Sequence, residues 1–62
     1  MTLRAKLLHA LRGPGASPLH LAATIHEPVE RVTAELRLMH LAGLADEYGG
    51  VWYRGAPPKE RA

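Results

Sequence analysis

Four histidines are the side chains best suited to metal or acid–base chemistry in this 62-residue chain, which contains no cysteine. They are His9, His20, His26 and His40. No two of them lie four residues apart, and none has the cysteine or aspartate neighbour that makes a metal site persuasive. Scattered imidazoles of this kind are more typical of polar surface residues, so we expect no metal site.

The carboxylates give no catalytic pattern either. Asp46 and Glu47 are adjacent, so in a strand they point to opposite faces and cannot act together as an acid–base pair. No Ser-His-Asp arrangement is recognisable, and Gly13-Pro14-Gly15 lacks the lysine and the spacing of a phosphate-binding loop. We therefore expect a protein that is not an enzyme and that needs no cofactor.

The charge balance permits an anionic partner without requiring one. Eight lysines and arginines against six aspartates and glutamates give a net charge of +2. The chain has no asparagine or glutamine, so any reading of bases must rely on arginine, threonine or apolar contacts.

No apolar run reaches the ~18 residues of a membrane span, and charged residues interrupt the opening segment, unlike a signal peptide. We expect a cytoplasmic protein with no membrane contact.

Two amphipathic helices are expected in the first half of the chain. Leucines recur at helical spacing over residues 2–12, and Gly13-Pro14-Gly15 should end that helix. Ser17-Pro18 is a helix-start signature, because the serine can accept a backbone N–H and proline is tolerated at the first helical position. The second helix should run to about Ile25, with either Leu19 or Leu21 facing inward.

A third and longer helix should follow Pro28, since the residue before a proline is disfavoured in a helix. Its apolar stripe repeats at helical spacing, and Gly43 stands where a glycine cap is expected. The residues of this stripe are Val29, Val32, Leu36 and Met39. It is the longest predicted element.

Residues 44–48 and 51–54 read as two strands of a hairpin around Gly49-Gly50, a pair that suits a tight primed turn. Alternation places Trp52 on one face and Tyr53 on the other, so one ring should pack on the third helix while the other is more exposed. The alternative is that all three aromatic rings pack in the hydrophobic core, because the chain has no phenylalanine. We expect residues 1–55 to form one domain and residues 56–62 a disordered tail.

This order of elements, with the segment LHLAATIHEPVERVTAELRLMHLAGLADEYGGVWYRG, resembles the winged helix-turn-helix domains of small bacterial and phage transcriptional regulators. The positions that match are Leu21-Ala22, Ile25, the turn His26-Glu27-Pro28, Val32, Leu36, Met39 and Ala42-Gly43-Leu44. The resemblance implies a mainly α fold with a small β-hairpin, and a third helix that enters the major groove of DNA. The chain departs from the family at His26, where glycine is common, and in a third helix that is not basic.

On a helical wheel the third helix turns several candidate contact residues away from its apolar stripe. In a major groove, Arg31 and Arg37 could meet guanine or phosphate, Thr33 a phosphate, and Ala34 a thymine methyl group. Arg54 would supply charge on the hairpin. The alternative is that these side chains form an ordinary solvated helix face.

Leu38 and Leu41 are also placed away from the stripe, and with Ala34 they form a row suited to helix packing. Exposed leucines on a small protein suggest a partner, either a second copy that makes a homodimer or another protein. The alternative is that the first helix covers them through Leu8 or Leu11.

Two functions of different classes therefore follow. The first is a regulator that binds double-stranded DNA. The second is a protein-interaction or dimerisation module that uses the outward face of the third helix. The fold favours the first function, whereas the acidic Glu30 and Glu35 and the weak net charge favour the second.

Overall fold

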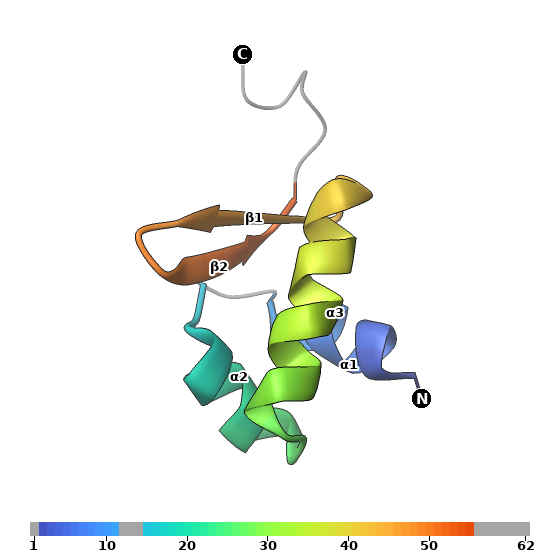
Figure 1. Ribbon diagram of the computed structural model, residues 1–62, viewed down its shortest axis with the longest axis vertical. Helices are drawn as coiled ribbons and strands as arrows, with labels where there is room; N and C mark the ends of the chain where they lie inside the picture. The colour runs from blue at the N-terminus through green and yellow to red at the C-terminus, as the bar shows by residue number, and fades with distance from the viewer. Residues whose placement is uncertain (1, 12–14, 56–62) are drawn as a thin grey trace.

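The computed structural model describes residues 2–11 and 15–55. Three helices are followed by two strands (Figure 1). They are α1 (Leu3–Ala10), α2 (Pro18–Ile25), α3 (Val29–Leu41), β1 (Ala45–Tyr48) and β2 (Val51–Arg54). This is a mainly α, winged-helix-like arrangement, which confirms the predicted fold class. The predicted tail at 56–62 lies outside the described residues.

The first two helices begin at side-chain caps. The hydroxyl oxygen of Thr2 accepts a hydrogen bond from the Ala5 N–H at 3.1 Å, and that of Ser17 accepts one from the His20 N–H at 3.2 Å. Each bond satisfies a backbone donor that the first helical turn leaves unpaired. The cap predicted from Ser17-Pro18 is thus confirmed.

A left-handed residue joins α2 to α3. His26 caps α2 with φ 58° and ψ 49°, a conformation that glycine adopts without strain and that other residues avoid. The N–H of Glu27 then donates to the Ala22 carbonyl at 3.0 Å and tightens the turn. His26 therefore adopts a backbone conformation typical of glycine, at the position where the winged-helix domains that this chain resembles often have glycine.

The end of α3 forms a Schellman cap. The N–H of Gly43, at φ 79°, donates to the His40 carbonyl at 3.0 Å. The N–H of Leu44 donates to the Met39 carbonyl at 2.8 Å, which completes the pair of bonds that defines this cap. The chain is thereby turned from α3 directly into β1.

The two strands pair antiparallel, with Tyr48 opposite Val51 and Ala45 opposite Arg54. Gly49 and Gly50 connect them, and both have positive φ, as a type I′ turn requires. The hairpin lies beside the C-terminal half of α3, while α2 lies beside its N-terminal half (Figure 1).

One residue outside the two strands also pairs with the hairpin. Ala16, just before α2, forms an antiparallel bridge with Trp52: the Ala16 N–H donates to the Trp52 carbonyl at 3.0 Å, and the Trp52 N–H donates to the Ala16 carbonyl at 2.8 Å. β2 is thus held on one side by β1 and on the other by Ala16. The sequence did not predict this pairing.

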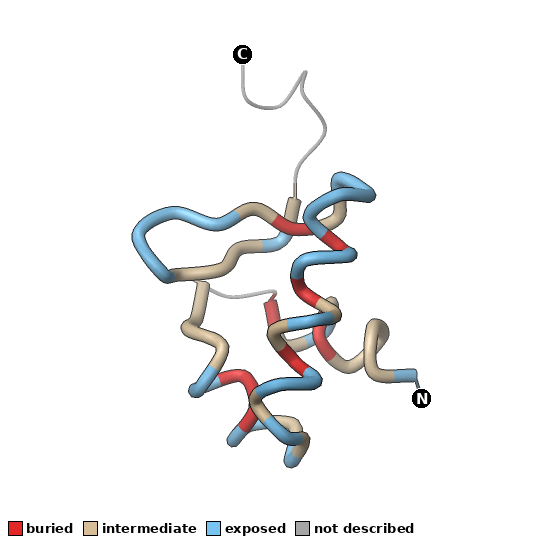
Figure 2. The backbone as a smooth tube through the Cα atoms, viewed as in Figure 1, coloured by how far each residue is buried: buried red, intermediate tan, exposed pale blue. Residues whose placement is uncertain are grey.

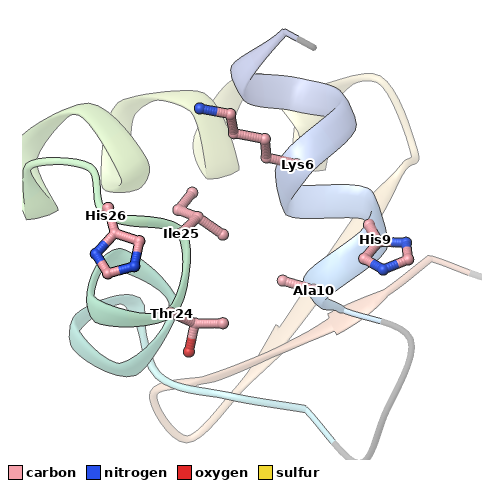
Figure 3. Close-up of a pocket in the computed structure, with 6 residues that line it drawn as sticks. All are labelled: Lys6, His9, Ala10, Thr24, Ile25 and His26. Carbon is pink, nitrogen blue, oxygen red and sulfur yellow. The ribbon is translucent and has the colours of Figure 1, made fainter.

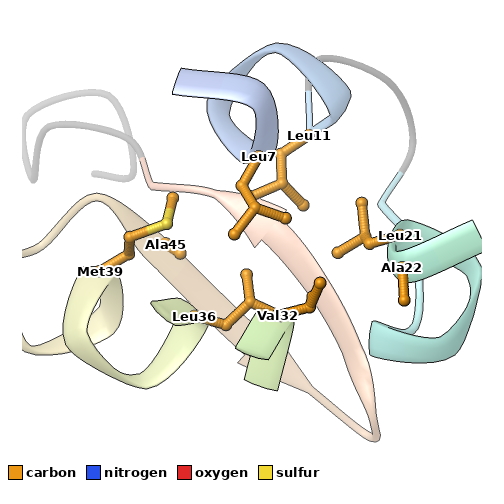
Figure 4. Packing of buried hydrophobic residues seen from close by; sticks show 8 residues of the cluster. All are labelled: Leu7, Leu11, Leu21, Ala22, Val32, Leu36, Met39 and Ala45. Carbon is orange, nitrogen blue, oxygen red and sulfur yellow. The ribbon is translucent and has the colours of Figure 1, made fainter. Parts of the chain in front are cut away.

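The core is built from all three helices and β1 (Figures 2 and 4). Its buried members are Leu7, Leu11, Leu21, Ala22, Val32, Leu36, Met39 and Ala45. Leu21 is the inward leucine of α2, whereas Leu19 is 70% exposed. Within the described part of the chain, no helix is long and apolar enough to cross a lipid bilayer.

Candidate functional site

One side of α3 faces away from the rest of the molecule, and we call it the outer face. Its residues are Glu30, Ala34, Arg37, Leu38 and Leu41, and all of them are exposed. The opposite side of the helix carries Val32, Leu36 and Met39, whose side chains are fully buried. Because the helix repeats every ~3.6 residues, burial of that stripe turns the outer face to solvent. Figure 2 shows the alternation of buried and exposed positions along α3.

Two further predicted contact residues flank the outer face. Arg31 is largely exposed, and its Nη1 atom lies 3.7 Å from Oε1 of Glu27, four residues earlier in the turn before α3. Thr33 is half-buried. The structure therefore brings Arg31, Ala34 and Arg37 to one accessible region and leaves Thr33 at its edge.

Two carboxylates next to this region are held by cations of α1. The Nε atom of Arg4 lies 2.6 Å from Oε2 of Glu35, and the Nζ atom of Lys6 lies 3.2 Å from Oε2 of Glu27. Glu35 therefore faces α1, which corrects its predicted contribution to the acidity of the outward face. Glu30 is the carboxylate of the outer face.

The two leucines of the outer face are open to solvent. Leu38 is 53% exposed and Leu41 is 82% exposed. The alternative that α1 covers them is wrong, because both stay exposed while Leu8 of α1 and Leu11 of its cap pack against or in the core. Their apolar surface is therefore available to a partner.

The hairpin divides its aromatic rings between its two faces. Trp52 packs against the core, with its ring edge-on to that of His40 at a centroid distance of 6.1 Å. His40 in turn places Nδ1 2.9 Å from the Ala45 carbonyl oxygen, so this side chain connects α3 to both strands. On the other face, Tyr48 lies 5.9 Å from Tyr53 between ring centroids.

The alternative that all three rings close the core is wrong for Tyr48, which is 62% exposed. The prediction that one ring packs on α3 is confirmed for Trp52. Arg54 is exposed at the end of β2, opposite Ala45 in the strand pairing. Its side chain is therefore accessible to a ligand. It lies at the base of the hairpin, at the opposite end of β2 from the glycine turn.

These side chains offer the chemistry of non-covalent binding: guanidinium groups, a hydroxyl and apolar surfaces. Among residues 2–11 and 15–55, no group of three or more histidine, cysteine, aspartate or glutamate side chains could hold a metal ion. No family model, no curated protein sequence and no solved structure matches the chain. The relation to winged-helix regulators is therefore a resemblance in the order of elements and in the residues that build them.

Proposed function

We propose that this protein binds double-stranded DNA and acts as a small transcriptional regulator. In this proposal the outer face of α3 enters the major groove and the hairpin lies beside the phosphate backbone. The winged-helix-like order of elements supports it, because a helix that follows a tight turn is the usual reading element of such folds. A major groove about 12 Å wide admits one helix.

The observation that carries the proposal is the distribution of paired and unpaired charge. Glu27 and Glu35 are held by Lys6, Arg31 and Arg4, which reduces their repulsion of phosphate. Arg37 is exposed and has no carboxylate within ion-pair distance among the described residues.

Arg54 is also exposed, and among the described residues it too has no carboxylate within ion-pair distance. The guanidinium groups left for a polyanion thus come from two elements, α3 and the hairpin. Glu30 opposes this charge and is the residue whose neutralisation should help binding.

Each candidate contact residue has a distinct role in this proposal. Arg37 and Arg54 neutralise phosphates. Arg31 does so when it leaves Glu27 to Lys6, and either arginine of α3 can instead donate to a guanine edge. Thr33 donates to a phosphate from the edge of the face. Ala34 contacts a thymine methyl group. Because asparagine and glutamine are absent, phosphate contacts supply most of the affinity.

The test is a titration of fluorescent duplex DNA with the protein at about 50 mM and about 200 mM monovalent salt. About three phosphate contacts predict a slope of about −2.7 in log K against log salt, which is a loss of about 40-fold across this range. Absence of any binding at the lower salt concentration would rule out a DNA-binding module.

A second function is favoured by the exposure of Leu38 and Leu41. With Ala34 they form an apolar row on α3 that could dock a second copy of the chain or another protein. The two functions use the same face of the helix, so a copy engaged through these leucines would have less of α3 free for DNA. The molecular mass in solution distinguishes self-association from the monomer.

A further inference from the structure

A hollow of about 320 Å³ lies between α1 and α2, away from the outer face of α3. Its lining residues are Lys6, His9, Ala10, Thr24, Ile25 and His26 (Figure 3). The volume is at the lower end of the range of small-molecule sites in proteins, about 300–1,000 Å³. None of the lining residues belongs to α3 or to the hairpin, so the hollow is separate from the candidate DNA-binding surface.

The inner part of this hollow is apolar. Ala10 and Ile25 are partly buried and pack against the core on either side of it. The hydroxyl of Thr24 donates to the His20 carbonyl at 2.8 Å, and in Figure 3 its methyl carbon points toward Ala10. A ligand in the hollow would therefore meet aliphatic groups from both helices.

The rim carries nitrogen donors. Figure 3 places Lys6 and His9 on the α1 side, and His26 on the α2 side. Lys6 has three N–H groups, of which one reaches Oε2 of Glu27 at 3.2 Å. His26 is exposed, and its left-handed backbone directs the chain out of α2 at the edge of the hollow.

The charge beside the rim is positive on balance. The single carboxylate of Glu27 is shared by Lys6 at 3.2 Å and Arg31 at 3.7 Å, so this cluster of two cations and one anion keeps one positive charge. A ligand with one negative charge would complete the pairing. A dianion would be brought against Glu27 and is disfavoured.

From this combination we propose that the hollow binds a small monocarboxylate with an apolar body. Its carboxylate accepts hydrogen bonds from Lys6 and from the His26 ring, and its alkyl or ring portion packs between Ala10 and Ile25. No residue of the outer face lines the hollow, and the test below uses the chain without DNA, so the proposal does not rest on DNA binding.

The probe is hexanoate, added to the full ¹⁵N-labelled chain at neutral pH while amide chemical shifts are recorded. Saturable shifts should map to Ala10, Ile25 and His26, with a Kd of about 1 mM for a ligand of this size. Hexanol lacks the charge and acetate lacks the apolar body, so each should need at least about tenfold more ligand. Equal response to hexanoate and hexanol would mean non-specific apolar association and would overturn the proposal.

Three variants make the test specific. Ala10→Leu fills the hollow and should abolish the saturable shifts. Lys6→Met should weaken hexanoate binding about tenfold, whereas Glu27→Gln, which removes the same ion pair but keeps the ammonium, should preserve or strengthen it. If Glu27→Gln weakens binding as much as Lys6→Met does, or if Ala10→Leu leaves it intact, the hollow is not the site.

Discussion

The Nε atom of Arg4 lies 2.6 Å from Oε2 of Glu35, which joins the first turn of α1 to the middle of α3. Both side chains are partly exposed, so solvent weakens their attraction. The pair has a second consequence besides fixing α1, because it holds a carboxylate away from the surface that we propose for DNA.

A double-mutant cycle of Arg4→Met and Glu35→Gln should show a coupling free energy of about 0.5 kcal/mol in urea unfolding at low salt. Methionine keeps the apolar part of the arginine side chain, so the measured loss of stability reports the removal of the charge. The coupling should fall toward zero at about 1 M salt, where the Debye length is about 3 Å. Additive effects of the two single changes at low salt would show that the pair contributes no stability.

Leu36 and Leu41 provide a matched pair of substitutions in one helix. Leu36 is fully buried, so Leu36→Ala should lower the free energy of unfolding by about 3 kcal/mol, which is enough to unfold much of a small domain. Leu41 is 82% exposed, so Leu41→Ala should change it by about 0.5 kcal/mol or less. Circular dichroism at 222 nm with urea measures both. Equal losses would mean that Leu41 is covered in solution.

His26→Gly should stabilise the protein, because the backbone there has φ 58°. Removing the left-handed strain gains about 1–2 kcal/mol, and the greater freedom of glycine in the unfolded chain offsets part of that gain. A net rise of about 0.5 kcal/mol in the free energy of unfolding is expected. His26→Ala is the control and should not stabilise. A loss of stability in the glycine variant would show that the imidazole makes a contact that outweighs the strain.

Charge substitutions on the outer face test the DNA proposal directly. Arg37→Gln should weaken duplex binding about tenfold and reduce the salt slope by about 0.9, since one phosphate contact is lost. Glu30→Gln should strengthen binding, because it removes the carboxylate of that face. Lys6→Gln changes the net charge as Arg37→Gln does but acts on DNA only through Glu27, which Arg31 still pairs, so it should have a smaller effect. Equal losses for the two variants would indicate non-specific attraction.

Leu41→Glu tests self-association. If a second copy packs on the apolar row of α3, the unmodified protein should sediment as a dimer, and this substitution should yield a monomer with unchanged helix content. Leu19→Glu places the same charge on another exposed leucine and serves as the control. A monomeric mass for the unmodified protein at about 100 μM would exclude the homodimer. Loss of DNA binding in Leu38→Ser equal to that in Arg37→Gln would tie the two functions together.

The elements were predictable because their signals are local. The Ser17-Pro18 start, the stripe of Val32, Leu36 and Met39, and the Gly49-Gly50 turn each depend on neighbours within a few residues, and each appears as expected. The end of α1 was less well defined: the helix stops at Ala10, and Leu11 follows as its cap.

What the sequence could not supply are relations between distant residues. The bridge between Ala16 and Trp52 has no local signature, because a single paired residue shows no alternating pattern. The pairing of Arg4 with Glu35 likewise depends on how α1 packs against α3. The wheel correctly placed Arg31, Ala34 and Arg37 on the exposed side of α3 with Thr33 at its edge, but their role in binding DNA stays a prediction.

The bridge to Ala16 also makes the segment before α2 depend on a strand that is synthesised later. The segment before α2 finds its hydrogen-bonding partner in Trp52, a residue made near the end of the described chain, and the same indole packs against the core. A nascent chain that stops before β2 lacks both contacts. The helices therefore depend on a late strand for completion, and folding is expected to be one cooperative event after residue 52 has been added, rather than a stepwise assembly from the N-terminus.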